Sequence, residues 1–534
     1  MCENINGTII QEDFTMEKPE FRRGIAWLVM LLMLVGMTGA CGEEKTDMKV
    51  RIDPANISEF NGGVFEGWGT SLCWWANRIG YSDTLAQLAA EAFCDLEKGL
   101  GLNILRYNIG GGDDPTHDHI TRTDSMMPGF WKNPSVGALQ GDYAWEYDWN
   151  QDAAQRNVLK KCLAVYGDGM LVEAFSNSPP YFMTQSGCSS GAKMAFQNNL
   201  KEDAYDAFAR YLADVAEHFK KEWGICFQSL SPMNEPDTSY WSAFSSKQEG
   251  CHFDAGAAQS RILTAVAAQL AQRGLDDIQL VGTDETSIDT QALNLSRLSE
   301  EALQAIQRVD THSYQGSGRE FLRKQVLRRG KNLWMSEVDG GNTLGAHAEE
   351  MGAGLWLAQR ITEDLNGLTP SAWILWQVID SHICRDGYLG RRDSGMVNTS
   401  GGYWGTAVAD HDRQDLILTM KYYTFGQFTR YIRPGSRLIR VSGPSAAAMD
   451  ETGRKLTVVM FNTEETEKTA WIDLSAFGEQ FPAGCRVSSV RTSGSMAEGE
   501  HWADLPEGNT AEGGYLARLA PYSVTTYIIY ARTK

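Results

Sequence analysis

Short apolar runs alternate with amphipathic stretches through most of the chain, between about residues 62 and 430. Eight runs are almost continuously apolar, as strands buried on both faces are. They are Phe65–Leu72, Asn103–Ile109, Gly169–Phe175, Phe227–Met233, Ile278–Gly282, Arg308–Ser313, Asn332–Ser336 and Ser371–Val378. Apolar residues recur at helical spacing between them, over Asp83–Lys98, Gln151–Tyr166, Lys201–Trp223, Ala255–Gln272 and His347–Leu365. This alternation predicts parallel βαβ units.

Eight such units in one stretch favour an α/β fold in which a (β/α)8 TIM barrel occupies residues 61–430. A doubly wound open sheet is the alternative. It is disfavoured because no GxGxxG turn follows any of the early strands.

Beyond residue 430 the apolar pattern changes to a period of two, with glycine and proline at the turns. The segments are Lys455–Phe461, Thr469–Leu474, Cys485–Thr492 and Ser523–Tyr530. They predict an appended antiparallel β-sandwich over residues 431–534. Within residues 41–60, Lys49–Ile52 and Ile57–Phe60 are also strand-like, and we expect them to join the same sandwich.

The first forty residues have the pattern of an export signal. Arg22 and Arg23 precede the apolar run Ile25–Met37, and small residues lead into Cys41. This arrangement predicts a signal peptide over residues 1–40, and the run is shorter than the ~20 residues of a membrane span. The residues before Cys41 resemble a bacterial lipobox; an ordinary signal peptide is the alternative. We therefore expect an exported protein, either a cell-envelope lipoprotein anchored only through lipid at Cys41 or a secreted one.

Composition and net charge exclude some classes of function. Apolar residues make up 43% and charged residues 22%, as in globular proteins rather than disordered ones. The net charge of −20 argues against a nucleic-acid partner, which needs a basic face. The chain is rich in aromatic residues, with 16 Trp and 19 Tyr, so part of them can form a surface on which sugar rings stack.

One cluster of metal-binding residue types stands out, comprising Asp113, Asp114, His117 and His119. No further ligands follow at a fixed spacing, and the cysteines form no CxxC pair. The cluster is therefore interpreted as a solvated loop, and neither a metal nor a cofactor is predicted.

Two glutamates lie at the C-terminal ends of predicted strands, where barrel enzymes carry their catalytic residues. Glu235 follows the fourth predicted strand, and Glu337 follows the seventh. Two carboxylates across a barrel mouth are what glycosidic cleavage requires, because one donates a proton while the other attacks the sugar. Three other carboxylates are rivals for the attacking group: Asp284, Glu285 and Asp339.

Five segments at predicted strand ends carry recognisable motifs. They are Gly67–Leu72 (GWGTSL), Leu105–Gly111 (LRYNIGG), Phe175–Thr184 (FSNSPPYFMT), Asn234–Pro236 (NEP) and Ser336–Glu337. Together they resemble glycoside hydrolase family 30, over residues from about 61 to the C-terminus. The resemblance implies a retaining mechanism, with Glu235 as general acid/base and Glu337 as nucleophile.

The resemblance also implies which residues bind the substrate. Asn234 would bind the sugar 2-hydroxyl, and Arg106 would keep the nucleophile ionised. His312 and Tyr314 would orient Glu337 or the substrate. The other expected substrate-binding residues are Asn177, Trp74, Tyr181 and Trp376. Further aromatic candidates for stacking on sugars are Trp75, Trp241, Tyr403 and Trp404.

The third-strand motif and the loop Ser186–Gly191 resemble the endo-β-1,6-galactanase group of this family. We therefore expect a β-linked galactan, the β-1,6-galactan side chains of arabinogalactan, as substrate. Tyr181 and Phe182 stand where that group often has tryptophan, and β-1,6-glucanase or glucosylceramidase-like activity is the alternative, followed by xylanase. A non-catalytic, glycan-binding surface lipoprotein is disfavoured because both glutamates are present.

Overall fold

The computed structural model describes residues 46–340, 350–388 and 404–532. The predicted signal peptide, Cys41 and Tyr403 lie outside these ranges. Among the described residues, no helix is both long and apolar enough to cross a membrane.

Eight parallel strands close into a barrel within the described part of the chain, in the order β10, β11, β2, β3, β6, β7, β8 and β9. The strands are β2 (Gly67–Ser71), β3 (Ile104–Asn108), β6 (Leu171–Phe175), β7 (Ser229–Ser231), β8 (Gln279–Ser287), β9 (Arg308–Gln315), β10 (Asn332–Val338) and β11 (Ala372–Leu375). Each overlaps one of the eight apolar runs. The predicted (β/α)8 barrel is confirmed, and the open-sheet alternative is wrong.

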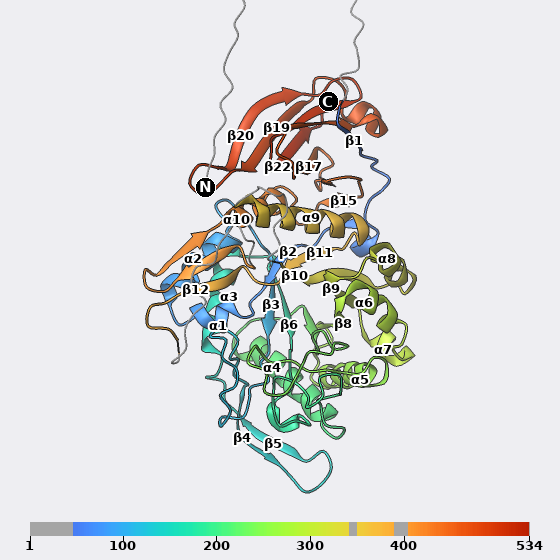
Figure 1. The fold of residues 1–534 in the computed structure, drawn as a ribbon. Helices are drawn as coiled ribbons and strands as arrows, with labels where there is room; N and C mark the ends of the chain where they lie inside the picture. Colours follow the sequence, from blue (N-terminus) through green and yellow to red (C-terminus); the bar gives the residue numbers. More distant parts are fainter. Residues whose placement is uncertain (1–45, 341–349, 389–403, 533–534) are drawn as a thin grey trace, which may run out of the picture. The chain divides into compact units, whose positions relative to one another are not determined.

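Helices follow the strands and surround the barrel (Figure 1). They are α1 (Trp75–Ile79), α2 (Asp83–Cys94), α3 (Ala153–Tyr166), α4 (Tyr205–Glu222), α5 (Ala257–Gln272), α6 (Ile288–Leu295), α7 (Glu300–Ala305), α8 (Arg319–Arg328), α9 (Met351–Gly367) and α10 (Met420–Thr429). Helix α4 shows why these segments are helical. Phe208, Leu212, Val215 and Phe219 recur every three or four residues and are fully buried, so one face of the helix packs on the barrel.

Two small sheets lie in the connections between barrel elements. A hairpin of β4 (Trp131–Val136) and β5 (Tyr143–Tyr147) lies between β3 and α3. A three-stranded sheet follows β11, and its strands are β12 (Ile379–Ile383), β13 (Ala407–Asp410) and β14 (Asp415–Leu418). The apolar pattern did not predict either sheet.

The C-terminal part forms the predicted β-sandwich. One sheet contains, in spatial order, β15 (Arg437–Ile439), β16 (Ser445–Met449), β17 (Lys455–Asn462), β22 (Ser523–Tyr530), β19 (Arg486–Ser493) and β20 (Glu500–Asn509). The other contains β1 (Met48–Arg51), β18 (Lys468–Asp473) and β21 (Gly514–Leu519). Val50, Ile472 and Val458 belong to a shared apolar core, which holds the two sheets together.

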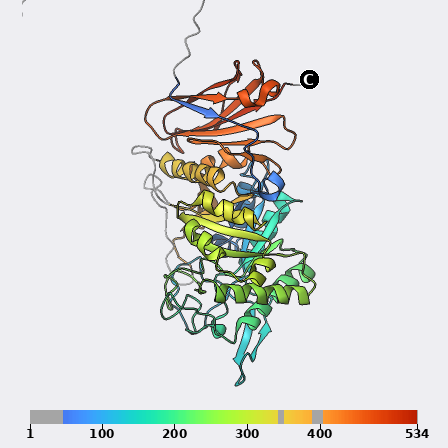
Figure 2. The same cartoon turned by 90° about the vertical axis from the view of Figure 1, so that its right-hand side faces the viewer.

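The sandwich takes a strand from the N-terminal segment. Strand β1 runs parallel to β18, with Met48 opposite Ala470, and Figure 2 shows it as a blue arrow among the red strands. In the same segment, Ile57 forms a single antiparallel bridge with Ile439 of the other sheet. Both sheets of the sandwich are thus tied to residues that precede the barrel in sequence.

Helices α9 and α10 connect the barrel to the sandwich, and Figure 1 shows them between the two. The Trp502 indole donates to the carbonyl of Tyr423 at 2.7 Å. Gly426 of α10 lies so close to that indole that a Cβ there would be 2.2 Å from the ring. Asn366 of α9 donates to the carbonyl of Ser445 at 2.9 Å. Barrel and sandwich are therefore packed directly against each other.

A buried ion network occupies the barrel interior. The Glu173 carboxylate accepts from Arg106 Nε at 2.8 Å and from the Arg308 guanidinium. Arg308 also donates to Asp310 at 2.6 Å and lies 3.4 Å from the ring centre of Trp334. All four charged side chains are within 2% of complete burial. Because an unpaired charge is costly in such a place, each member of the network depends on the others.

We predict that Glu173→Ala lowers the free energy of unfolding by about 3–5 kcal/mol, because Arg106 and Arg308 each lose a buried carboxylate partner. Urea denaturation followed by tryptophan fluorescence measures this loss. Glu217→Ala is the matched control, since Glu217 pairs with Lys221 on the surface of α4, and it should cost less than about 1 kcal/mol. Equal losses in the two variants would contradict the prediction.

Candidate active site

A cavity of about 590 Å³ lies at the C-terminal ends of the barrel strands. Its volume is typical of pockets that bind small ligands. The lining residues are Arg122, Asn234, Glu235, Tyr240, Trp241, Ser245, Lys247, Gln248, Thr286, Tyr314, Gln315, Glu337, Trp376, Asp380 and Trp404. Glu235 and Glu337, which the sequence placed on the fourth and seventh strands, therefore share one cavity.

Glu235 lies four residues beyond the end of the short strand β7, where the backbone turns sharply. Its φ of 47° is left-handed, a conformation that a non-glycine residue adopts rarely and often at functional sites. Its backbone N–H donates to the carbonyl of Asp284 at 2.8 Å, which holds this turn. The carboxylate contacts His312 Nδ1 at 3.1 Å and accepts from the Tyr240 hydroxyl.

Glu337 lies within β10 and faces Glu235. Arg106 Nη1 donates to its Oε2 at 3.2 Å, and the Tyr314 hydroxyl donates to its Oε1 at 3.1 Å. One carboxylate oxygen of Glu235, one of Glu337 and a ring nitrogen of His312 all lie within 4.8 Å of one another. The two carboxylates are thus close enough to act on a single bond.

Asp284 holds the cations of the site in place. It accepts from Arg106 at 2.5 Å, contacts His312 Nε2 at 3.1 Å and accepts from the Ser336 hydroxyl at 2.6 Å. Burial opposes its ionised form, but Arg106 and His312 outweigh burial and hold the pKa of Asp284 well below its usual range. Asp284 is therefore an ionised structural partner rather than a free nucleophile.

His312 is a cation shared by the two glutamates. Burial disfavours its charge, but Glu337, Asp284 and Glu235 surround it and raise its pKa well above the ordinary value. With both ring nitrogens protonated, it donates to Glu235 and to Asp284. Its Nδ1 also lies 3.5 Å from Glu337, so one imidazolium stabilises negative charge on either glutamate.

The two glutamates titrate as a coupled pair. Burial, together with repulsion from Glu235, raises the pKa of Glu337 to about 7. Burial acts in the same direction on Glu235, but hydrogen bonds from His312 and Tyr240 outweigh it and lower the pKa of Glu235. Because His312 serves both carboxylates, the proton that they retain near neutral pH belongs to the pair rather than to one residue.

Asn234 and two tryptophans complete the binding surface. The side-chain oxygen of Asn234 is buried and accepts no hydrogen bond from any described residue, so it can accept one from a sugar hydroxyl. Trp376 follows β11 and packs edge-on against Trp74. Trp404 stacks on Tyr314 with ring centres 5.7 Å apart. These aromatic rings offer apolar faces on which a sugar can stack.

Five expected substrate-binding residues do not line the cavity. Arg106 and His312 lie behind the two glutamates and contact them, and the other three lie elsewhere. Trp74 is fully buried beneath Trp376 and supports it. Asn177 is buried and donates to Asn108 at 3.0 Å. Tyr181 lies in a short 3-10 helix, η2 (Tyr181–Met183), and packs on Trp131. Their roles in binding remain predictions.

The other rival carboxylates have partners elsewhere. Glu285 accepts from Gln259 and Asn294 at 2.9 and 3.0 Å. Asp339 forms a fully buried ion pair with Lys421. Neither lines the cavity, so Glu337 is the carboxylate on β10 that faces Glu235.

Several lining residues were not predicted from the sequence. Tyr240 contacts Glu235 from five residues downstream. Arg122 bridges Asp124 and Asp380, with contacts of 2.5 and 2.9 Å, at the edge of the cavity. Both residues lie on long loops without a periodic apolar pattern. For Tyr240, its closeness in sequence to Glu235 was the one available signal; for Arg122 the sequence gave none.

Comparisons with known proteins give the family of this chain. The model of O-glycosyl hydrolase family 30 matches residues 48–292. An endo-β-1,6-galactanase from Hypocrea rufa is 30% identical, over 88% of this chain and 88% of its own length. An exo-β-1,6-galactobiohydrolase from Bifidobacterium longum subsp. longum is 25% identical, over 78% of this chain but 34% of its own length.

The solved catalytic domain of a family 30 xylanase from Talaromyces cellulolyticus has the same fold. It superposes with a TM-score of 0.65 at 17% identity, over 90% of this chain and 99% of the xylanase domain. The extent of the match to the Hypocrea rufa relative settles the classification. This chain belongs to glycoside hydrolase family 30 and is an O-glycosyl hydrolase.

Proposed function

We propose that this enzyme hydrolyses β-1,6-linked galactan with retention of configuration at the sugar. The observation that carries the proposal is the close pair of buried glutamates at the mouth of the barrel. One oxygen of the Glu235 carboxylate lies within 4.8 Å of one oxygen of the Glu337 carboxylate. Retaining enzymes need carboxyl groups about 5–5.5 Å apart, whereas inverting enzymes leave about 6.5–9.5 Å for a water molecule.

In the proposed first step, Glu337 attacks the anomeric carbon while the glycosidic C–O bond breaks. The proton of the pair is then on Glu235 and passes to the departing oxygen. His312 and Tyr240 favour ionised Glu235 in the free enzyme, so this step requires the proton to move to Glu235 within the pair. Arg106 and Tyr314 support that movement, because both donate hydrogen bonds to the ionised form of Glu337.

In the proposed second step, water attacks the anomeric carbon of the glycosyl–Glu337 ester. Glu235, now ionised, accepts a proton from that water, and Glu337 leaves as a carboxylate. His312 contacts Glu235 at 3.1 Å and lies 3.5 Å from Glu337, so it stabilises whichever of the two is ionised at each stage.

The choice of galactan is supported by the relatives. The two reported above carry names that specify β-1,6-galactan chemistry, and one of them aligns along most of both chains. The sequence motif Ser176–Pro180 and the loop after it point to the same group. Trp376 and Trp404 give the cavity apolar faces for the sugar rings.

The purified protein should release galacto-oligosaccharides from β-1,6-galactan. Chromatography of the products from parallel digests of β-1,6-galactan, β-1,6-glucan and xylan tests this expectation. Release from β-1,6-glucan alone would overturn the choice of sugar and leave the two-glutamate mechanism standing. A protein inert on every β-linked substrate would contradict the mechanism as well.

Glu235→Gln should lower kcat on galactan by about 10²–10⁴-fold, because the departing oxygen loses its proton donor. An aryl galactoside with an acidic leaving group needs no such proton. On this aryl galactoside, Glu235→Gln should release the phenol in a fast burst. It should then turn over slowly, because the glycosyl–enzyme accumulates. Glu337→Gln should show no burst on either substrate, and the surface variant Glu217→Gln should match the wild type. A burst from Glu337→Gln would mean that the two roles are reversed.

Tyr314→Phe should move the acidic limb of the kcat/KM profile to higher pH by about one unit. The variant removes a donor to ionised Glu337, so the pKa of this carboxyl rises and a higher pH is needed to ionise it. Steady-state kinetics across the pH range measures the shift. Tyr515→Phe, in the sandwich, should leave the profile unchanged, and an unmoved acidic limb in Tyr314→Phe would argue against Glu337 as nucleophile.

A further inference from the structure

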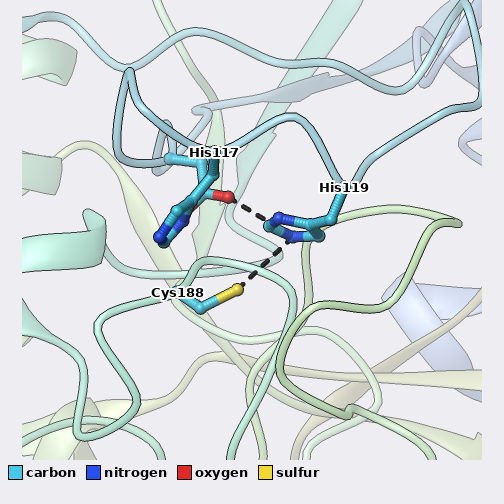
Figure 3. Close-up of side chains that lie close together, drawn as sticks. His117, His119 and Cys188 are labelled. Atoms are coloured by element: carbon cyan, nitrogen blue, oxygen red, sulfur yellow. Dashed lines mark hydrogen bonds and ion pairs between the residues drawn. The ribbon is translucent and has the colours of Figure 1, made fainter.

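A second cluster of reactive side chains lies outside the catalytic cavity. Asp113, His117 and His119 belong to the loop that follows β3, and Cys188 belongs to the loop that follows η2. Figure 3 shows the Cys188 sulfur directed at the His119 ring, with His117 beside it on the same loop. Each residue offers one ligand atom, and all four atoms lie within 4.8 Å of one another.

The measured contacts have the spacing of ligands around one ion. Asp113 Oδ1 is 3.3 Å from His117 Nδ1, and Asp113 Oδ2 is 3.4 Å from His119 Nε2. Cys188 Sγ is 3.4 Å from the same His119 nitrogen. Tetrahedral Zn²⁺, with bonds of about 2.0–2.3 Å, places its ligand atoms roughly 3.3–3.6 Å apart, so small side-chain movements would complete the shell.

The geometry does not fit a Cys–His–Asp catalytic triad. In a triad, the carboxylate orients the histidine through the ring nitrogen opposite the one that faces the nucleophile. Here the sulfur and the carboxylate both contact Nε2 of His119, whereas Nδ1 is buried with no hydrogen-bond partner among the described residues. Convergence of both groups on one nitrogen is what a shared ion produces.

The surroundings hold these ligands in place. The backbone N–H of Ser189 donates to Asp113 at 3.0 Å, and that of Phe244 donates to the Cys188 sulfur at 3.3 Å. The Phe244 ring packs against both imidazoles, with ring centres 5.1 and 5.3 Å away. Hydrogen bonds to ligand atoms and an apolar cover are typical surroundings of metal sites.

We propose that Asp113, His117, His119 and Cys188 bind one Zn²⁺ in a closed tetrahedral site. Imidazole nitrogens and a thiolate favour zinc over calcium or magnesium, which take oxygen ligands. Four protein ligands leave no open position, so the site is structural rather than catalytic. On binding, the Cys188 thiol releases its proton to solvent and its sulfur bonds to the ion.

Zinc at this position would fix a wall of the catalytic cavity. The Phe244 backbone is held by the Cys188 sulfur, and Ser245 N–H donates to Ser190 at 3.1 Å. Ser245, Lys247 and Gln248 line the catalytic cavity. Three loops, after β3, η2 and β7, therefore meet at the ion, and the ion would set the position of the last one beside the substrate.

The test uses the full chain, stripped with a chelator and dialysed against zinc. Elemental analysis should find one zinc per chain, and zinc should raise the melting temperature. Cobalt in place of zinc should give a near-ultraviolet thiolate-to-cobalt band and the visible bands of a tetrahedral ion. Cys188→Ser and His119→Ala should each lower zinc affinity by at least ~100-fold, more than the loss of an outer hydrogen bond does, and Cys188→Ser should abolish the thiolate band.

Two controls make the result specific. Cys226→Ser removes an exposed thiol elsewhere on the chain, and Glu337→Gln alters the catalytic cluster; both should keep one tightly bound zinc. Circular dichroism of the zinc-free proteins checks that each variant is folded, and Asp113→Asn replaces any variant that is not. Failure of the wild type to retain zinc would overturn the proposal. So would unchanged zinc affinity in folded Cys188→Ser and His119→Ala.

Discussion

The centre of the barrel depends on the ion pairs that the buried guanidinium of Arg106 forms with three carboxylates. The guanidinium contacts the carboxylates of Glu173, Asp284 and Glu337 at 2.8, 2.5 and 3.2 Å. These carboxylates come from three different strands, so one cation fixes the relative positions of β6, β8 and β10. Without it, Glu173 would keep Arg308, and Asp284 and Glu337 would keep His312. Each of the three buried carboxylates would still lose a cationic partner, at a cost of up to several kcal/mol. The same cation that stabilises the barrel also holds one of the two reacting groups.

The fold could be predicted because the barrel strands are buried on both faces. A run such as Leu171–Phe175 is apolar throughout apart from Glu173, and β7, β9 and β10 are buried along almost their whole length. Strand β20 was missed because none of its residues is buried and their exposure follows no clean alternation. In the hairpin β4–β5, Tyr143 is the one buried residue and the others are partly or fully exposed. The buried strands of the barrel are therefore easier to recognise in the sequence than these partly exposed strands.

The same limit applies to the site. Glu235 and Glu337 could be found because they adjoin strands whose positions were predictable. Tyr240 and Arg122 reach the cavity on loops, whose course depends on contacts that no local sequence pattern records. Cys188 is the clearest case: it follows Asp113 by 75 positions, and only the folded chain brings its sulfur to the histidines. Asp113, Asp114, His117 and His119 were interpreted as a solvated loop because no further ligand follows them at a fixed spacing in the sequence.

The parallel pairing of β1 with β18 has a consequence for the order of folding. Met48 meets Ala470, so one of the first described strands must wait for more than four hundred residues before its partner is synthesised. The barrel strands pair with close neighbours in sequence, apart from the closure between β2 and β11, and can assemble earlier. Contacts of such long sequence separation form slowly, because loop-closure entropy must be overcome first. The core of the sandwich is therefore expected to form last, when β1 pairs with β18 and joins the two ends of a barrel that has already folded.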